Sequence, residues 1–176
     1  KRFVSIPWSD AARQTFCYAG ERPIAITGIR DARADFSVNE EVGPVLDEFV
    51  LDFPSPAAAR RAFERAVGQA RSCVGTTSIG DAASTTTYTY SQGSVPLVTV
   101  AGIPSFFFDT VRVFSGTNVS GGRDTARSYS VYSLVRDVVI VTSYTVFGGT
   151  ADPVISTSQR RLVNETAAKA VTRWNG

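Results

Sequence analysis

The chain has 176 residues, of which 43% are hydrophobic and 19% are charged, as in one globular domain with a core of its own. The formal net charge of +2 is too small to predict binding to nucleic acid or to a membrane surface. The sequence contains no histidine, which excludes Ser-His-Asp and Cys-His catalysis and zinc sites with histidine ligands.

The N-terminal part of the chain is predicted to contain a short helix followed by two strands. Ser9-Asp10 is typical of a helix N-cap, so we expect a short helix that ends at about Cys17. Ile24 to Ile29 alternates apolar and small residues, and Val45 to Phe53 is rich in apolar residues. Both patterns indicate strands, and Pro54 ends the second one.

The next element is a long helix with a clear local start signal. Serine is a preferred N-cap and proline suits the first helical position, so Ser55-Pro56 predicts a helix N-terminus. Gly75 fits the end of this helix. Between these points apolar residues recur at helical spacing and form one stripe, namely Ala59, Phe63, Ala66, Val67, Ala70 and Cys73.

From Thr85 onward the apolar period changes to two, which indicates β-strands. Only Val135-Arg136-Asp137 separates the last two strands, so we expect them to form a hairpin. Asp152-Pro153 then opens a second long helix. The predicted strands are Thr85 to Tyr90, Leu97 to Val100, Phe107 to Phe114, Ala126 to Leu134 and Val138 to Phe147. The predicted inner face of the second helix consists of Ile155, Leu162, Val163, Ala167, Ala170, Val171 and Trp174.

These elements predict an α+β fold, a mostly antiparallel β-sheet with helices packed on one face. The sequence has no internal repeat, linker or low-complexity tract, so residues 1–176 are expected to form a single domain. A cleft between the sheet and the helices is the natural place for a ligand.

Cys17 and Cys73 are the only cysteines and are separated by 55 residues. We expect them to form one disulfide, because the chain has no redox or metal motif, and a disulfide points to a protein outside the cytoplasm. Closing a loop of this size stabilises a fold by about 4 kcal/mol in the chain-entropy description. The alternative is a pair of buried free thiols in a cytosolic protein.

Two segments carry a resemblance to a known family. Phe49-Val-Leu-Asp-Phe-Pro-Ser-Pro-Ala-Ala-Ala-Arg-Arg-Ala-Phe63, followed by a helix end at Ser72-Cys73-Val-Gly75, resembles the PknH-like extracellular sensor domains. The hairpin from Tyr129 to Val146 resembles the segment near the C-terminus of that family. The resemblance implies an extracellular or periplasmic location, a cleft that binds a ligand, and attachment to the membrane only through an anchor that has been removed.

Two departures refine what the resemblance implies. Kinase sensor domains of this family are expected to have two disulfides, whereas this chain can form one. Members also tend to have tryptophan three residues before the helix cysteine, where this chain has Ala70. We therefore expect an actinobacterial lipoprotein or secreted relative rather than the kinase sensor itself.

Aromatic and arginine residues on the predicted strands are the candidate ligand-binding residues. Tyrosine and phenylalanine suit a glycan, lipid or other apolar ligand, and arginine suits an anionic lipid or cell-wall polymer. Rings that fill the sheet–helix interface and arginines that pair with local carboxylates are the alternative. Arg123 and Arg136 are expected to gather near the same sheet. The predicted site consists of Tyr88, Tyr90, Phe107, Arg112, Arg127 and Tyr129.

The sequence predicts a non-catalytic ligand-binding or sensing domain without a metal or cofactor. An alternative is a module that docks on an envelope protein through an exposed patch at Phe106-Phe107-Phe108. A carboxylate-dependent hydrolase is a further alternative, because seven acidic residues lie between Asp31 and Asp52. We expect those residues to lie on a solvated sheet edge or loop, and Gly116 to Gly122 to form a hairpin loop.

Overall fold

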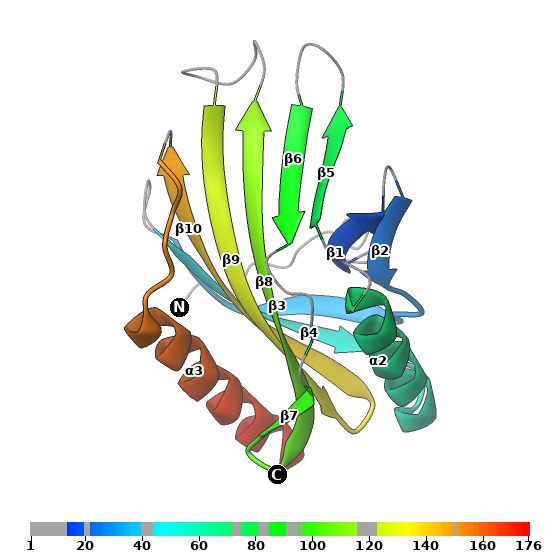
Figure 1. Ribbon diagram of the computed structural model, residues 1–176. Helices are drawn as coiled ribbons and strands as arrows, with labels where there is room; N and C mark the ends of the chain where they lie inside the picture. The colour runs from blue at the N-terminus through cyan, green and yellow to red at the C-terminus, as the bar shows by residue number, and fades with distance from the viewer. Residues whose placement is uncertain are drawn as a thin grey trace.

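A computed structural model of the chain confirms an α+β fold dominated by antiparallel strands (Figure 1). It describes residues 14–19, 22–39, 44–71, 75–80, 85–90, 95, 97–115, 123–149 and 151–176. The helices in these ranges are α2 (Pro56–Ala70) and α3 (Thr157–Asn175). The strands are β1 (Gln14–Ala19), β2 (Arg22–Ile26), β3 (Asp31–Asn39), β4 (Val45–Asp52), β5 (Gly75–Gly80), β6 (Thr85–Tyr90), β7 (Leu97–Val100), β8 (Ile103–Ser115), β9 (Arg123–Val135) and β10 (Val138–Gly149).

The main sheet has eight strands among the described residues, and every pair is antiparallel. Its order is β3-β4-β10-β9-β8-β6-β5, and β7 pairs with the start of β8. β1 and β2 form a separate two-stranded ribbon. The long strands β8, β9 and β10 lie at the centre, so the best-connected part of the sheet comes from the C-terminal half of the chain.

The predicted hairpin of the last two strands is confirmed. Val135 pairs with Val138, and Arg136-Asp137 forms the turn between them. Arg136 has a left-handed φ of 54° in this turn. β10 is rich in β-branched residues and is buried on both sides over most of its length, which is typical of a central strand whose two faces are both covered.

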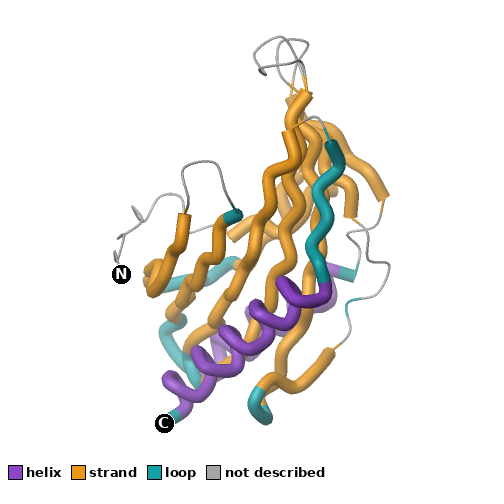
Figure 2. The backbone as a smooth tube through the Cα atoms, turned by 90° about the vertical axis from the view of Figure 1, so that its left-hand side faces the viewer, coloured by secondary structure: helices purple, strands orange, loops and turns teal. Residues whose placement is uncertain are grey.

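The two helices cover opposite faces of the main sheet, so the prediction that they pack on one face is wrong (Figure 2). Neighbouring strand residues point to opposite faces. Phe106 and Phe108 therefore pack in the cluster that contains α2, whereas Phe107 packs in the cluster that contains α3. Because β8 carries large apolar side chains on both sides, each face of the sheet needs a cover of its own.

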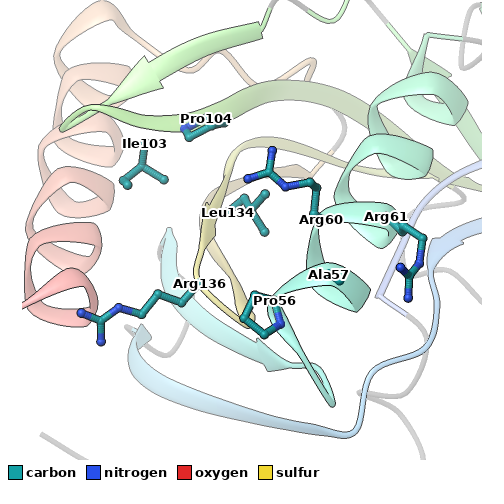
Figure 3. A pocket seen from close by; sticks show the side chains of 8 residues that line it. All are labelled: Pro56, Ala57, Arg60, Arg61, Ile103, Pro104, Leu134 and Arg136. Atoms are coloured by element: carbon teal, nitrogen blue, oxygen red, sulfur yellow. The ribbon is translucent and has the colours of Figure 1, made fainter.

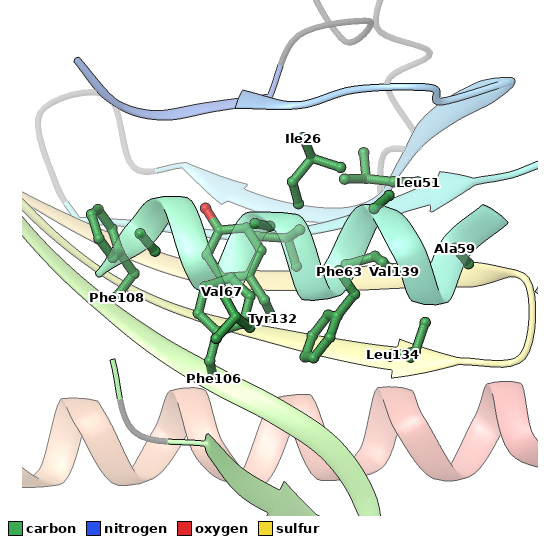
Figure 4. Packing of buried hydrophobic residues seen from close by; sticks show 14 of the residues in the cluster. Ile26, Leu51, Ala59, Phe63, Val67, Phe106, Phe108, Tyr132, Leu134 and Val139 are labelled. Atoms are coloured by element: carbon green, nitrogen blue, oxygen red, sulfur yellow. The ribbon is translucent and has the colours of Figure 1, made fainter. Parts of the chain in front are cut away.

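The core on the α2 side is built around aromatic rings (Figure 4). Phe106 stacks on Tyr132 of the neighbouring strand with a centroid distance of 4.6 Å, and Phe63 of α2 packs against Phe106 at 5.4 Å. Leu51 and Ile26 complete the same cluster from β4 and β2. The apolar stripe predicted for α2 is thus its buried face.

The helix starts follow from their capping residues. The Ser55 hydroxyl accepts a hydrogen bond from the backbone N–H of Ala58 at 3.2 Å, and Pro56 occupies the first turn, as predicted. The second helix begins at Thr157 rather than at Asp152, because Ser156 and Gln159 form a capping box there.

The predicted N-terminal helix is wrong in its described part, because Gln14 to Ala19 form β1. Cys17 pairs with Ile24 across the ribbon, a contact that local capping signals do not reveal. Helix α2 ends at Ala70, before the expected end at Gly75 and three residues before Cys73. The structure contains no disulfide among the residues it describes. The side chain of Cys17 and all of Cys73 lie outside them, so the disulfide stays a prediction.

Besides β1, two strands, β3 and β5, were not predicted from the sequence. β3 occupies the edge of the main sheet beside β4 and carries Asp31 and Asp35 of the acidic segment. Asp47, Glu48 and Asp52 lie on the inner strand β4, and Glu48 is 3% exposed, so the expected solvated edge is wrong for Glu48. β5 forms the opposite edge beside β6. On α3, Leu162 is 44% exposed and does not belong to the predicted inner face.

Within the described residues, neither helix combines the length and apolar character that crossing a bilayer requires. The predicted loop at Gly116 to Gly122 lies outside the described residues.

Candidate functional site

A groove runs between α2 and the neighbouring strands β7, β8 and β9 (Figure 3). Two adjoining hollows with volumes of about 520 and 310 Å³ form it, and they share Arg60, Pro104 and Leu134. We call the two together the α2 groove. Each hollow falls within the range of about 300 to 1,000 Å³ that is typical of small-molecule sites.

The inner wall of the α2 groove is apolar. Phe63 and Val67 line it from the buried face of α2, and Leu134 lines it from the end of β9. Ile103 and Pro104 add the start of β8. Phe63, Val67 and Leu134 belong to the core of the α2 face, whereas Ile103 packs against the cluster that contains α3.

One large apolar side chain of the groove lies open to solvent. Leu97 of β7 is 59% exposed. An exposed leucine beside an apolar groove is a contact surface that a ligand can cover.

The rim of the α2 groove is cationic. Arg60, Arg61 and Arg71 come from α2, and Arg136 comes from the β9–β10 turn. Glu64 is the single acidic residue of the lining. Within the described part of the chain, the three α2 arginines form no ion pair, whereas Arg136 donates a hydrogen bond to the backbone oxygen of Asn175 at 2.9 Å.

The rim arginines differ in direction. In Figure 3 the Arg60 side chain extends across the groove beside Leu134 and Pro104, whereas Arg61 lies on the far side of α2. Arg136 extends toward the end of α3. Arg60 is therefore the cation best placed to meet a ligand on the apolar wall.

The other face of the sheet has arginines of a different kind, in a cluster that we call the α3 seam. Asp109 of β8 is 3% exposed and accepts two hydrogen bonds of 3.0 Å from the guanidinium of Arg127 on β9. Arg160 of α3 also binds Asp109. Arg160 lies over the ring of Tyr129 as well, 4.6 Å from its centroid.

Hydrogen bonds from α3 complete the α3 seam. The Tyr129 hydroxyl donates to the side-chain oxygen of Asn164 at 3.3 Å, and the side-chain amide of Gln159 donates to the Tyr144 hydroxyl at 3.1 Å. Farther along the helix, Arg173 binds the buried carboxylate of Glu48. These contacts hold α3 on the sheet and close this face.

Ionisation at the α3 seam follows from this pairing. Burial raises the pKa of the Asp109 carboxyl, but the hydrogen bonds from Arg127 and Arg160 outweigh it and leave the pKa below its ordinary value. The hydrogen bond to Asp109 raises the pKa of Arg127, and burial raises the pKa of Tyr129. Asp109 is therefore a fixed anion, the opposite of a carboxyl kept protonated to act as a general acid.

The predicted ligand residues do not share one open surface. Phe107, Arg127 and Tyr129 meet at the α3 seam, where Phe107 stacks on Tyr129 with a centroid distance of 5.7 Å. Arg112 follows Phe108 at an even position of β8 and thus lies on the opposite face. The backbone of Tyr88 pairs with Arg112 and that of Tyr90 with Thr110, but both tyrosine side chains lie outside the described part of the chain.

The structure also bears on the two alternative functions. Phe106 and Phe108 are buried, so the expected exposed docking patch at these positions is wrong. Both buried carboxylates among the described side chains, Glu48 and Asp109, are paired with arginines. No group of acidic residues in the described ranges is arranged to hold a metal ion.

Sequence reasoning missed most of the α2 groove, although a signal was present. Arg60, Arg61, Arg65 and Arg71 face only one glutamate within α2, Glu64, so helix ion pairs cannot satisfy all of them. The apolar wall gives no such signal, because Leu134 and Pro104 meet α2 only in the folded chain.

Comparisons with known proteins agree with this fold. A family model described as the PknH-like extracellular domain matches residues 9–169. The crystal structure of the extracellular domain of PknH from Mycobacterium tuberculosis is similar, with a TM-score of 0.51 and 16% sequence identity. The similarity covers 83% of this chain and 66% of that chain. No curated protein matches the sequence.

Proposed function

Because the chain belongs to the PknH-like extracellular domain family, we propose that it is an extracellular sensor domain that binds its ligand in the α2 groove. The observation that carries this proposal is the pairing of an apolar wall with α2 arginines that form no ion pair among the described residues. The α2 arginines are exposed and have no carboxylate among the described residues that fixes them, so a ligand that enters the groove can pair with them.

The contrast with the α3 seam supports the choice of site. At the seam each cation has a buried carboxylate and the helix lies flat on the sheet. In the α2 groove a hollow stays open between helix and strands, with Leu97 and Pro104 exposed beside the largely buried Phe63, Val67 and Leu134. The arginines of the α3 seam stabilise the fold, and the arginines of the α2 groove are available to a ligand.

Placement on the cell envelope is the second part of the proposal. The family consists of extracellular domains, which indicates an extracellular placement for this chain. We infer that it belongs to an actinobacterial lipoprotein or receptor that is anchored in the membrane. The similar crystal structure supports likeness of fold alone, since its sequence identity to this chain is 16%.

A disulfide between Cys17 and Cys73 is the third part of the proposal. β2 contacts α2, and β1 contacts β6, so the ribbon that carries Cys17 lies against both elements. Cys73 lies in the short connection between the end of α2 and the start of β5. Cys73→Ser is expected to lower the free energy of unfolding by about 4 kcal/mol under oxidising conditions. Equal melting of the wild type with and without dithiothreitol would contradict the disulfide.

Native mass spectrometry with one groove-filling variant tests the ligand site. Gly68 lines the groove, and an added Cβ there meets no atom within 4 Å, so we expect the side chain of Gly68→Leu to extend into the groove without displacing the core. The wild type, incubated with a small-molecule extract of cell envelopes, is expected to retain an adduct that Gly68→Leu loses. Gly68→Ala is the control. An adduct retained equally by both proteins, or by neither, contradicts the proposed site.

A further inference from the structure

We infer that the ligand of the α2 groove is an anionic amphiphile with one alkyl chain, its carboxylate or phosphate at Arg60 and its chain along the apolar wall. This inference rests on the proposed function and names the chemical class of the ligand. Three properties of the groove carry it: the charge of the rim, the chemistry of the lining and the length of the wall.

The charge of the rim selects an anion. Four arginines line the groove against one glutamate. Arg60 extends over the apolar wall and pairs with no carboxylate among the described residues. A guanidinium presents a planar fork of donors that matches a carboxylate or a phosphate, which makes it the natural head-group contact.

The chemistry of the lining argues against a sugar or a nucleotide. Beyond its arginines and Glu64, the lining consists of proline, alanine, glycine and large aliphatic or phenyl side chains. None of these lining residues is a serine, threonine, asparagine, glutamine, tyrosine or tryptophan. Away from the arginines and Glu64, sugar hydroxyls would lose water without gaining side-chain hydrogen bonds, whereas burial of methylene groups is favourable.

The length of the wall favours a chain over a compact anion. The lining follows α2 from Pro56 to Arg71, which at about 1.5 Å per residue is roughly 22 Å. The wall continues from Leu134 to the exposed side chain of Leu97 on β7. A free phosphate would use one end of this surface, whereas an alkyl chain covers it and removes Leu97 from water.

Calorimetric titration with three matched probes tests the class. The probes are dodecanoate, dodecanol and dodecyltrimethylammonium, each below the concentration at which it forms micelles. Dodecanoate is expected to bind about tenfold more tightly than dodecanol, because a charged hydrogen bond to Arg60 is added. The cationic probe is expected to bind most weakly. Shortening the carboxylate by two methylenes should weaken binding about fifteenfold.

Two arginine variants on the same helix locate the head group. Arg60→Gln is expected to reduce dodecanoate affinity to that of dodecanol, while dodecanol binding stays unchanged. Arg65→Gln is the matched control, since Arg65 is exposed on α2 outside the groove lining. Equal losses in the two variants would mean a diffuse charge effect and would overturn the assignment of the head group to Arg60.

The outcomes separate this inference from the proposed site. If the wild type binds dodecanoate and dodecanol with equal affinity and Gly68→Leu binds neither, the site stands and the anionic class is overturned. If the wild type retains an envelope adduct that Gly68→Leu loses, but binds none of the three probes, the site stands and the amphiphile class is overturned. Dodecanoate that binds Gly68→Leu as tightly as the wild type overturns both the class and the site.

Discussion

The two faces of the main sheet use arginine in opposite ways. On the α3 face, Arg127 and Arg160 converge on Asp109, and the helix is held against the sheet. On the α2 face, Arg60 and Arg61 have no carboxylate partner among the described residues, and a groove stays open beside the helix. The difference shows that the same residue type either stabilises a seam or stays exposed beside a groove, according to whether the strand register supplies a buried anion.

The register of β8 decides which face receives that anion. Asp109 pairs with Tyr129 of β9 and shares the face of Phe107, two positions earlier. A shift by one residue would place the carboxylate on the α2 side and leave the α3 arginines without a partner. The distribution of paired and unpaired arginines is therefore a consequence of strand pairing.

Among the substitutions that test this comparison, the largest effect is expected from removing the anion of the α3 seam. Asp109→Asn leaves Arg127 and Arg160 facing each other, and we expect the free energy of unfolding to fall by about 3 kcal/mol. Urea denaturation at neutral pH measures this loss. A change below about 1 kcal/mol would mean that the α3 seam does not hold the helix and that the contrast between the faces is wrong.

The pH dependence of stability gives a second test of Asp109. The folded-state pKa of Asp109 lies below its unfolded value of 3.8, so the folded carboxyl resists protonation. The contribution of Asp109 to stability is therefore complete above about pH 4 and is lost as the pH falls through the folded-state pKa. The free energy of unfolding measured against pH should show this loss in the wild type, and Asp109→Asn should lack that part of it.

A smaller effect is expected from single arginines of α3, and two neighbours provide a matched pair. Arg160→Gln removes an ion pair to a buried carboxylate and is expected to cost about 1 to 2 kcal/mol. Arg161→Gln removes only an exposed pair with Glu165 and is expected to cost less than about 0.5 kcal/mol. Thermal unfolding of the two variants compares them directly. Equal costs would contradict the distinction between paired and exposed arginines on this helix.

The effect expected on the α2 face is small and has the opposite sign. Gly68→Leu replaces a poor helix former in an exposed helical position, so the free energy of unfolding should rise by up to about 1 kcal/mol. Chemical denaturation measures the gain. A loss of stability would mean that the added side chain meets the core rather than open space, and that the groove is shallower than described.

Local signals in the sequence were enough to predict the elements that frame the groove. Ser55-Pro56 located the start of α2, and the short turn at Arg136 located the β9–β10 hairpin. Both signals involve neighbouring residues whose backbone preferences agree with the fold. The apolar stripe of α2 also identified its buried face, because helical spacing alone brings those residues together.

Contacts between distant segments were beyond the reach of the sequence. The strand at Cys17 exists through its pairing with β2, and the opposite placement of α2 and α3 depends on which face of the sheet each helix reaches. Arg127 and Tyr129 were predicted as ligand residues because the residue types alone do not show that both are held in the α3 seam. The carboxylate that binds Arg127, Asp109, lies on another strand, and the Tyr129 hydroxyl donates to Asn164 on α3.

Hydrogen exchange of the backbone amides with and without saturating dodecanoate tests the central claim most directly. Slower exchange confined to α2, the β9–β10 turn and the start of β8, with α3 unchanged, is the result that an open ligand site on the α2 face predicts. Slower exchange in α3 and the strands around Asp109, with α2 unchanged, would place the ligand on the closed face and contradict the account.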